Sequence, residues 1–508
     1  MSERKRVEHE YVVVGAGSSG SVIARRLLDR GHSVHILEAG PEDTSESVHR
    51  PSSWPRLFDS ELDWAVRTVP QEYAKGRSLR MPRGKVLGGC GSLNGMIYMR
   101  GVPSDYDDWS YGGATGWDGE SVFPYFLKSE DHEDGASQWH GAGGLQPVCR
   151  IRDPHPTSAA FVDAAVSSGF PKTDDFNGEH PLGAGFNHLT MKDGRRMSTW
   201  RSFMTPVLGR PEVTVTTLAQ AHRVLFDGDR AVGVEYSVRG ELRRAYASAE
   251  VVLSAGVIGS PKLLLLSGIG PAGHLGEVGV DVRHDMPGVG ENLHDHLLVP
   301  NIYESAQPMP PGRYNSLESQ LYWKSDPRLL GPDLQPIFLH LVYPADGYPV
   351  PEHGYTIAPG LVRPLSRGNL RLAAADPARA PLVDPHVLEA AHDLETLVDA
   401  VEICREIGQS SAFREWRGAE VAPGPAARTR DDLREYVRST ATTYHHQVGT
   451  CRMGQDAMSV VDPELRVHGV RSLRVADASV MPAIPSGNTH APSMMIGEKA
   501  ADLVLSEA

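Results

Sequence analysis

The chain has 508 residues, of which 40% are hydrophobic and 22% are charged, so it is long enough for a large core and roughly two to three domains. Its 64 acidic side chains outnumber the 50 basic ones, and the formal net charge of -14 argues against nucleic acid as a partner. No apolar run approaches the ~20 residues that cross a bilayer, and the charged residues 1–10 lack the apolar run of a secretory signal. We therefore expect a cytoplasmic protein that does not span a membrane.

The pattern of residues 10–40 predicts a strand, a glycine-rich turn, a helix and a second strand. In such a turn the first glycine allows the tight bend, the second lets the backbone approach a pyrophosphate, and the third lets helix and strand pack closely. A carboxylate at the end of the second strand can accept hydrogen bonds from ribose hydroxyls and disfavours a 2′-phosphate. The segment predicts a site for NAD or FAD, formed by Gly15, Gly17, Ser18, Ser19, Gly20, Glu38 and Ala39.

A second glycine-rich stretch, residues 84–95, has little side-chain bulk, which suits close approach to a large flat ring. The alternative is a flexible surface loop. That loop would expose the apolar side chains of the same stretch, namely Val86, Leu87, Leu93, Met96 and Ile97. We therefore favour a loop that lies along a cofactor.

No strong metal motif is present. The four cysteines, Cys90, Cys149, Cys404 and Cys451, include no C-x-x-C pair, which indicates free thiols. His294 and His296 have a spacing that could hold a metal, but no carboxylate or further histidine has an evident reason to join them. We predict no metal.

Several long stretches, in order along the chain, resemble the signature blocks of the glucose-methanol-choline (GMC) family of FAD-dependent alcohol oxidoreductases. They are "PRGKVLGGCGSLNGMIYMRGVPSDYDDW" (82–109), "VVLSAGVIGSPKLLLLSGIGP" (251–271), "YHHQVGTCRMG" (444–454) and "SGNTHAPSMMIGEKAADL" (486–503). The resemblance, which is choline dehydrogenase-like, runs from residue 10 to the end and implies FAD rather than NAD. It also implies an α/β fold, in which a Rossmann-like FAD domain carries a discontinuous substrate-binding cap with an antiparallel sheet.

On this resemblance we expect the FAD domain to comprise residues 1–155, 205–298 and 430–508, and the substrate domain to comprise 156–204 and 299–429. The same resemblance assigns further residues to FAD. They are Gly84, Val86, Gly89, Gly91, Asn94, Gly95, Met96, Ala221, Ala255, Asp477, Ala478, Asn488 and Thr489. Some members bind FAD covalently through a histidine of the glycine-rich block, but Leu93 stands at that position, so we expect non-covalent FAD.

Alcohol oxidation by a flavin needs a base within hydrogen-bond reach of the hydroxyl, and histidine titrates in the right range. A single histidine is more often only a satisfied polar side chain. In the family pattern H-x-x-G-T the base matches His446, and a second His or Asn before the M-I-G-E helix matches His490, which would hold the substrate oxygen. His445, in an extended segment, would point to the opposite side.

The resemblance thus predicts oxidation of a CH–OH group, as in a primary alcohol, to the aldehyde, with hydride transfer to flavin N5. The alternatives are a hydroxynitrile lyase-like enzyme and a non-catalytic flavoprotein on the same fold. The electron acceptor could be dioxygen, a quinone or a cytochrome. The acidic net charge could suggest a cation such as choline, but bulk charge is a poor guide to a pocket, and residues 300–430 show no obvious aromatic cage.

Overall fold

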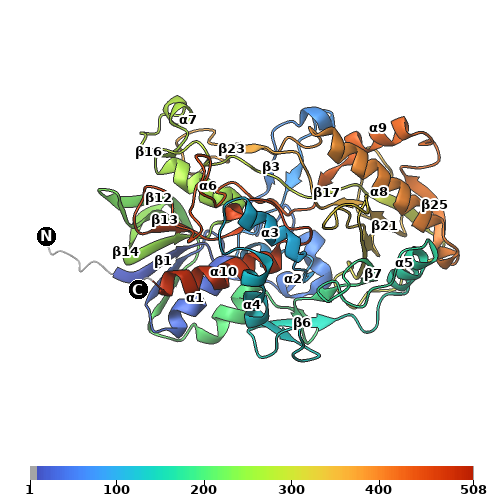
Figure 1. The fold of residues 1–508 in the computed structure, drawn as a ribbon, viewed down its shortest axis with the longest axis horizontal. Coiled ribbons are helices and arrows are strands. Elements are labelled where there is room, and N and C mark those ends of the chain that lie inside the picture. The colour runs from blue at the N-terminus through green and yellow to red at the C-terminus, as the bar shows by residue number, and fades with distance from the viewer. Residues whose placement is uncertain (1–7, 507–508) are drawn as a thin grey trace.

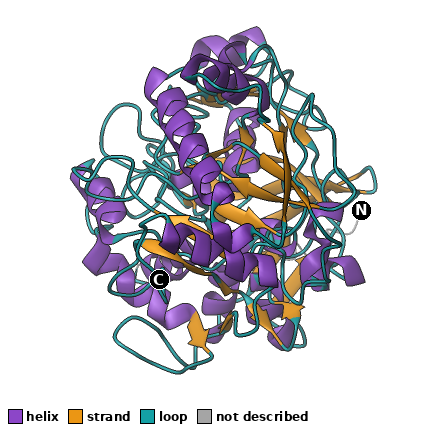
Figure 2. Ribbon diagram, turned by 90° about the vertical axis from the view of Figure 1, so that its right-hand side faces the viewer, coloured by secondary structure: helices purple, strands orange, loops and turns teal. Residues whose placement is uncertain are grey.

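The computed structural model describes residues 8–506 (Figure 1). The first seven residues, part of the charged amino terminus on which the signal-peptide argument rests, lie outside this range. Figure 2 shows strands toward the centre and helices at the periphery. Among the helices of residues 8–506, none is both long and apolar enough to cross a bilayer.

A seven-stranded mixed sheet carries the glycine-rich turn predicted near the amino terminus. Its order is β11-β2-β1-β14-β13-β12, and β27 also pairs with β14. The strands are β1 (Glu8–Val14), β2 (Val34–Leu37), β11 (Val213–Thr216), β12 (Ala219–Asp227), β13 (Arg230–Val238), β14 (Glu241–Leu253) and β27 (Leu473–Val475). Strands β11, β2, β1, β14 and β27 are parallel, and residues 11–14 of β1 are buried on both faces, as is typical of parallel strands.

Two helices lie against each other beside this sheet (Figure 1). They are α1 (Ser18–Asp29), which follows the glycine-rich turn, and α10 (His490–Leu505), the last helix of the chain. Gly497 permits their close approach, because a Cβ there would lie 2.8 Å from the Ser19 carbonyl oxygen. Arg26 of α1 pairs with the buried Glu498 of α10 at 2.7 Å. The carboxyl-terminal helix is thereby fixed on the glycine-rich turn.

A six-stranded antiparallel sheet forms the other half of the molecule, in the order β25-β18-β21-β20-β19-β7. The strands are β7 (Gly183–Phe186), β18 (Asn301–Ser305), β19 (Ser319–Tyr322), β20 (Ile337–Leu339), β21 (Gly354–Ala358) and β25 (Arg417–Ala422). Side chains alternate along β20. Phe338 packs with α5 (Pro156–Ser167) and α8 (Ala391–Gln409), whereas Ile337 and Leu339 belong to a second apolar cluster on the opposite face. The sheet therefore has one helix-covered face and one face toward the other sheet.

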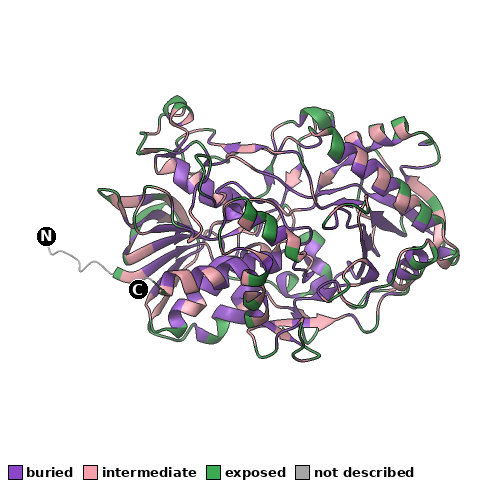
Figure 3. Cartoon of the chain, viewed as in Figure 1, coloured by how far each residue is buried: buried purple, intermediate pink, exposed green. Residues whose placement is uncertain are grey.

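The remaining helices and strands are mostly short. The helices are α2 (Glu46–His49), α3 (Pro103–Tyr111), α4 (Gly119–Ser129), α6 (Gly256–Leu266), α7 (Ala272–Glu277) and α9 (Arg430–Thr440). The strands are β3 (Val66–Arg67), β4 (Arg80–Met81), β5 (Glu130–His132), β6 (Gln146–Arg150), β8 (His188–Leu189), β9 (Met191–Lys192), β10 (Arg195–Arg196), β15 (Ile269–Gly270), β16 (His284–Asp285), β17 (Leu297–Leu298), β22 (Gly360–Leu361), β23 (Asn369–Arg371), β24 (Leu382–Asp384) and β26 (Thr442–Thr443). Figure 3 shows that the strands of both sheets are largely buried, whereas exposed residues lie on outer loops and helix faces.

Two helical stretches pack across the expected domain bounds. The π-helical turn Trp200–Met204, expected in the substrate domain, buries Trp200 and Phe203 in the core of the seven-stranded sheet. Helix α9, expected in the FAD domain, packs against α8 and shares its apolar cluster. Full burial of a large apolar side chain stabilises the fold most, so these stretches pack into the nearest core and not into the core of the domain expected from their position in the sequence. The division into domains itself stays a prediction.

Candidate active site

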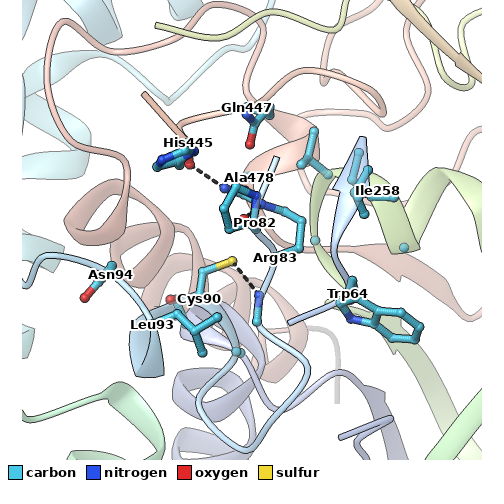
Figure 4. Close-up of a pocket in the computed structure, with 18 of the residues that line it drawn as sticks. Trp64, Pro82, Arg83, Cys90, Leu93, Asn94, Ile258, His445, Gln447 and Ala478 are labelled. Carbon is cyan, nitrogen blue, oxygen red and sulfur yellow. Dashed lines mark hydrogen bonds between the residues drawn. The ribbon is translucent and has the colours of Figure 1, made fainter. Parts of the chain in front are cut away.

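A cavity of about 610 Å³ lies between the seven-stranded sheet and the second face of the six-stranded sheet, and Figure 4 shows part of its wall. Most predicted site residues line it. They are Gly15, Gly17, Ser18, Ser19, Glu38, Ala39, Gly84, Gly89, Asn94, Gly95, Met96, Ala221, Ala255, His446, Asp477, Ala478, Asn488, Thr489 and His490. Three predicted residues, Gly20, Val86 and Gly91, are not part of the lining.

The turn after β1 is built for close backbone contact. Gly15 has a φ of +103°, and a Cβ there would lie 2.4 Å from the Ser254 carbonyl oxygen. A Cβ on Gly20 would lie 2.1 Å from the Gly15 oxygen, so Gly20 serves the packing of helix on strand although it does not line the cavity. Helix α1 starts at Ser18 with no side-chain cap, which leaves main-chain N–H groups available for an anion.

Glu38 is fixed on this turn by both carboxylate oxygens. One oxygen accepts a hydrogen bond from the Ala16 N–H at 3.0 Å, and the other accepts from the Gly40 N–H at 2.8 Å. Burial raises the pKa of Glu38 to about 7 despite these bonds. A buried acid with remaining acceptor capacity beside an uncapped helix start fits the ribose and pyrophosphate of a dinucleotide.

The glycine-rich loop of residues 84–96 folds back on itself against the turn. A Cβ on Gly84 would lie 2.2 Å from the Gly89 carbonyl, and a Cβ on Gly89 would lie 2.8 Å from the Gly17 Cα. The buried Arg196 donates to the Asn94 side-chain oxygen at 2.7 Å, which orients Asn94 on the cavity wall. Leu93 also lines the cavity, so this position carries no nucleophile. Both are labelled in Figure 4.

Asp477 follows β27 and joins two segments. Its carboxylate accepts hydrogen bonds from the N–H groups of Gly256 and Ser479, each at 2.8 Å, and from the Ser260 hydroxyl at 2.5 Å. Burial raises the pKa of Asp477. The side chain therefore holds the start of α6 against the carboxyl-terminal loop where both border the cavity.

His446 is buried and contacts two polar side chains. Its Nε2 lies 3.1 Å from the Asn488 Nδ2, and its Nδ1 lies 3.0 Å from the His296 Nδ1. Because an amide nitrogen can only donate, we assign the tautomer in which His446 Nε2 accepts from Asn488 and Nδ1–H donates to His296. Burial, followed by the neighbouring rings of His296 and His445 and the guanidinium of Arg83, holds the pKa of His446 well below its ordinary value. The ring is neutral, and its acceptor nitrogen, Nε2, accepts from Asn488 on the cavity wall.

A buried carboxylate fixes the segment that carries His446. Asp295 accepts from the His446 main-chain N–H at 2.8 Å and from the Gln447 side-chain amide at 2.5 Å, and the Thr443 hydroxyl donates to it as well. The His446 ring also stacks on Tyr444, with centroids 4.5 Å apart. Backbone and ring are therefore both held, which limits the conformational freedom of the imidazole.

In the structure, His446 and the expected second residue, His490, both line the cavity, but His490 is not a hydrogen-bond partner of His446. His490 is the first residue of α10, and its Nδ1 lies 3.0 Å from the Ser18 hydroxyl at the start of α1. Asn488, expected at the cofactor, contacts His446. The helix start explains the difference, because it turns His490 toward the glycine-rich turn and leaves Asn488 in the preceding loop. Within the described chain the buried Nε2 of His490 has no partner, which fits a polar group bound in the cavity.

Sequence reasoning missed the residues that support Asn488. The Gln335 side-chain amide donates to the Asn488 oxygen at 3.0 Å and to the Gln320 oxygen at 2.8 Å. Gln335 precedes β20 and Gln320 lies on β19, so the six-stranded sheet sets the orientation of the amide that faces His446. No local pattern marks these glutamines, since the fold alone brings the six-stranded sheet next to the loop that carries Asn488. One signal was available in the sequence. The family has either His or Asn at its second position, and this chain has an Asn, Asn488, two residues before the matched His490.

His294 and His296, weighed as a metal pair, contact different partners. His294 Nδ1 lies 2.6 Å from the Asn292 carbonyl oxygen, and its Nε2 accepts from the Ile484 N–H at 2.9 Å. His296 contacts His446 instead. Each ring therefore has a local structural role.

Away from the cavity, a different group of buried histidines comes together: His132, His140 and His188, whose ring nitrogens lie within 4.8 Å of one another. The two nitrogens of His140 contact Glu130 at 3.0 Å and Asp175 at 2.7 Å. Although burial opposes protonation, these carboxylates raise the pKa of His140 to about 9. A protonated His140 therefore sits between two acids, as part of a buried ionic network.

Comparison with known proteins identifies the family. The chain matches the GMC oxidoreductase family over residues 9–298 and 364–497. The chain belongs to the GMC oxidoreductases. It is 40% identical to the mitochondrial choline dehydrogenase of Homo sapiens, over 98% of this chain and 90% of that protein. It is 38% identical to an alcohol dehydrogenase [acceptor] of Pseudomonas putida, over 98% of this chain and 96% of that protein.

Solved structures confirm the fold. Pyridoxine 4-oxidase from Mesorbium loti superposes with a TM-score of 0.94 at 34% identity, covering 97% of this chain and 99% of that one. A formate oxidase of Aspergillus oryzae RIB40 superposes with a TM-score of 0.91 at 26% identity, covering 99% of this chain and 99% of that one. This GMC protein is thus an FAD-dependent oxidoreductase that acts on CH–OH donors, as the sequence predicted, and the lyase and non-catalytic alternatives are not favoured.

Proposed function

We propose that this oxidoreductase converts a primary alcohol to the aldehyde, that His446 accepts the hydroxyl proton and that Asn488 holds the hydroxyl oxygen. The observation that carries this assignment is the 3.1 Å contact between His446 Nε2 and Asn488 Nδ2 on the cavity wall. It differs from the sequence-based prediction, in which His490 holds the oxygen. Since relatives with different substrate names share the fold, the assignment rests on these side chains and not on any one relative.

The contact between His446 and Asn488 pairs one acceptor with one donor. An alcohol hydroxyl can replace this direct contact when the two side chains move apart, because its proton can be donated to His446 Nε2 while its oxygen accepts from the Asn488 amide. The neutral state of His446 keeps the acceptor available, and Asp295 and Tyr444 keep the ring in place. FAD, when bound, supplies the hydride acceptor. The chain therefore provides proton removal and orientation of the C–H bond.

The residues that would hold FAD are those of the glycine-rich turn, the loop of residues 84–96, Glu38 and the start of α10. Non-covalent attachment is part of the proposal, because Leu93 cannot form the histidyl bond found in some family members. We expect acid precipitation of the holoenzyme to leave the flavin in the supernatant. Flavin that remains with the precipitated chain would refute non-covalent attachment.

The test of the proposed reaction is anaerobic mixing of the holoenzyme with a panel of primary alcohols while the flavin absorbance is followed. Loss of the oxidised flavin band, with one aldehyde formed per flavin, is the expected result. A panel of aliphatic and aromatic primary alcohols that leaves the band unchanged would contradict the assignment.

The electron acceptor and the location of the protein stay predictions. Dioxygen and a carrier such as a quinone or a cytochrome are the two classes of acceptor. Oxygen uptake compared with reduction of a quinone analogue, measured on the same holoenzyme, distinguishes them. A cytoplasmic location is tested by cell fractionation.

A further inference from the structure

The carboxylates of the cavity lining belong to its cofactor side. Within the described chain they are Glu38 and Asp477. The oxygens of Glu38 accept from main-chain N–H groups, and those of Asp477 accept from two N–H groups and a serine hydroxyl. On the side of the six-stranded sheet, the described lining has apolar and aromatic side chains: Trp54, Phe58, Leu317, Ile337, Leu339 and Tyr343. A cation bound there would meet no carboxylate of the lining.

Two arginines add positive charge to this side. Arg83 lines the cavity and donates to the main-chain oxygens of Pro82 and His445, which are uncharged acceptors, and Figure 4 shows it directed at His445. Arg80 lies behind Phe58 and pairs with Asp59 at 3.0 Å, but both of those side chains are 38% exposed, so water weakens that pair. Burial, followed by the charges of Arg83 and Arg80, lowers the pKa of His445 to about 3. Both guanidinium groups therefore lie close enough to His445 to disfavour a positive charge on its ring.

The aromatic side chains do not form a free cage for a cation. The Arg80 guanidinium already lies 5.5 Å from the centroid of the Phe58 ring, so that ring serves an existing cation. The other contacts of Phe58 are edge contacts with Trp54 at 5.6 Å and with His445 at 5.1 Å. A second cation here would lose its hydration and face a like charge, whereas an uncharged apolar group would gain by burial.

We propose that this site selects uncharged alcohols with an apolar body and discriminates against quaternary ammonium alcohols such as choline, although choline dehydrogenases are among the relatives of the chain. This rests on the proposed function, because it concerns the body of the alcohol whose hydroxyl lies between His446 and Asn488. The proposal distinguishes two properties of a substrate. One is the reacting hydroxyl, whose chemistry the relatives share, and the other is the charge on the rest of the molecule.

Choline and 3,3-dimethyl-1-butanol provide the test, because they have the same shape and differ in a quaternary nitrogen against a quaternary carbon. We would mix each with the holoenzyme under anaerobic conditions over a range of concentrations and extract the limiting reduction rate and the dissociation constant. The ratio of rate to dissociation constant should favour the uncharged alcohol by at least ~10²-fold, since like charges in an interface are costly. An equal ratio, or one that favours choline, would overturn the proposal while leaving the proposed reaction intact.

If neither compound reduces the flavin, their dissociation constants are obtained from the perturbation of the oxidised flavin spectrum, and tighter or equal binding of choline would overturn the proposal. If the proposed reaction itself is wrong, none of the primary alcohols of the panel will bleach the flavin, so the two outcomes can be distinguished.

A pair of arginine variants tests the electrostatic cause. Arg80→Gln removes the guanidinium over Phe58 and should narrow the preference for the uncharged alcohol, mainly by lowering the dissociation constant of choline. Arg67→Gln is the matched control, because Arg67 approaches the same Asp59 at 3.7 Å, whereas the guanidinium over the Phe58 ring is that of Arg80. A preference that stays unchanged in Arg80→Gln, or narrows equally in Arg67→Gln, would contradict this cause.

Discussion

The two sides of the cavity differ in the kind of atoms that form them. The cofactor side is formed largely by main chain, in the turn after β1 and in the loop of residues 84–96, where glycines allow close contact. The catalytic side is formed by side chains such as His446, Asn488 and Gln335, which come from distant segments. A main-chain site depends on local conformation, whereas a side-chain site depends on how sheets and loops are brought together. The predictions below test whether the two sides also differ in function.

The largest effect is expected for His446→Ala. Loss of a positioned proton acceptor should slow anaerobic flavin reduction by ~10² to 10⁴-fold, with FAD still bound. The measurement is stopped-flow reduction by the best alcohol of the panel. His445→Ala is the matched control, because this neighbour also lines the cavity but contacts Phe58 and Arg83 rather than Asn488. If flavin reduction is equally slow in both variants, His446 has no role in proton removal that His445 lacks.

A smaller effect on the same side is expected for Asn488→Ala. A donor that stabilises developing negative charge on the substrate oxygen contributes on the order of 10² in rate, so reduction should slow by about that factor. Asn488→Asp should not restore the rate, because a carboxylate offers no donor. If Asn488→Ala keeps the parent rate but loses FAD, the original assignment of Asn488 to the cofactor is restored.

The sequence predicted most of the residues that line the cavity near the turn after β1, for a physical reason. The bend at Gly15 and the acid at Glu38 depend on neighbours within one strand, turn and strand, so their spacing already indicates the geometry. The helix expected to contain the M-I-G-E residues is α10, which begins at His490.

The catalytic side could be predicted only in part. The motif placed His446 on the cavity wall, but its contact with Asn488 depends on where α10 begins, and helix ends are poorly fixed by sequence. The contact of Gln335 with Asn488 requires the position of the six-stranded sheet, to which no local pattern refers. Similarly, Trp200 joined the core of the seven-stranded sheet because of packing that position along the chain does not reveal.

On the cofactor side, Glu38→Ala should weaken FAD binding and leave the reduction rate of the bound fraction nearly unchanged. Hydrogen bonds to a charged group contribute about 1.5–3 kcal/mol, which corresponds to an increase in the FAD dissociation constant of roughly 10- to 150-fold. Fluorescence titration of the apoprotein with FAD measures this. Glu38→Gln, which keeps one acceptor oxygen, should fall between the parent and Glu38→Ala. Unchanged affinity in both variants would show that Glu38 does not contact the cofactor.

The smallest effect concerns His140, outside both sides of the cavity. Its pKa of about 9 lies above the ordinary value of 6.5, so its ionic contacts stabilise the fold fully below pH 6.5 and lose that contribution as the pH rises through 9. The difference in urea unfolding free energy between the parent and His140→Gln should be about 1–2 kcal/mol at pH 6 and shrink by pH 10. Flavin reduction at pH 7 should stay near that of the parent. A difference that grows between pH 6 and pH 10 would contradict the protonated state of His140.

The central claim is that His446 and Asn488 act as a pair and that His490 acts separately. A double-mutant cycle on the anaerobic reduction rate tests it most directly, with His446→Ala, Asn488→Ala and His490→Asn alone and in combination. We predict that Asn488→Ala slows the parent strongly but slows His446→Ala far less, whereas His490→Asn has the same effect in both backgrounds. Independent effects of His446 and Asn488, together with strong coupling between His446 and His490, would contradict the account.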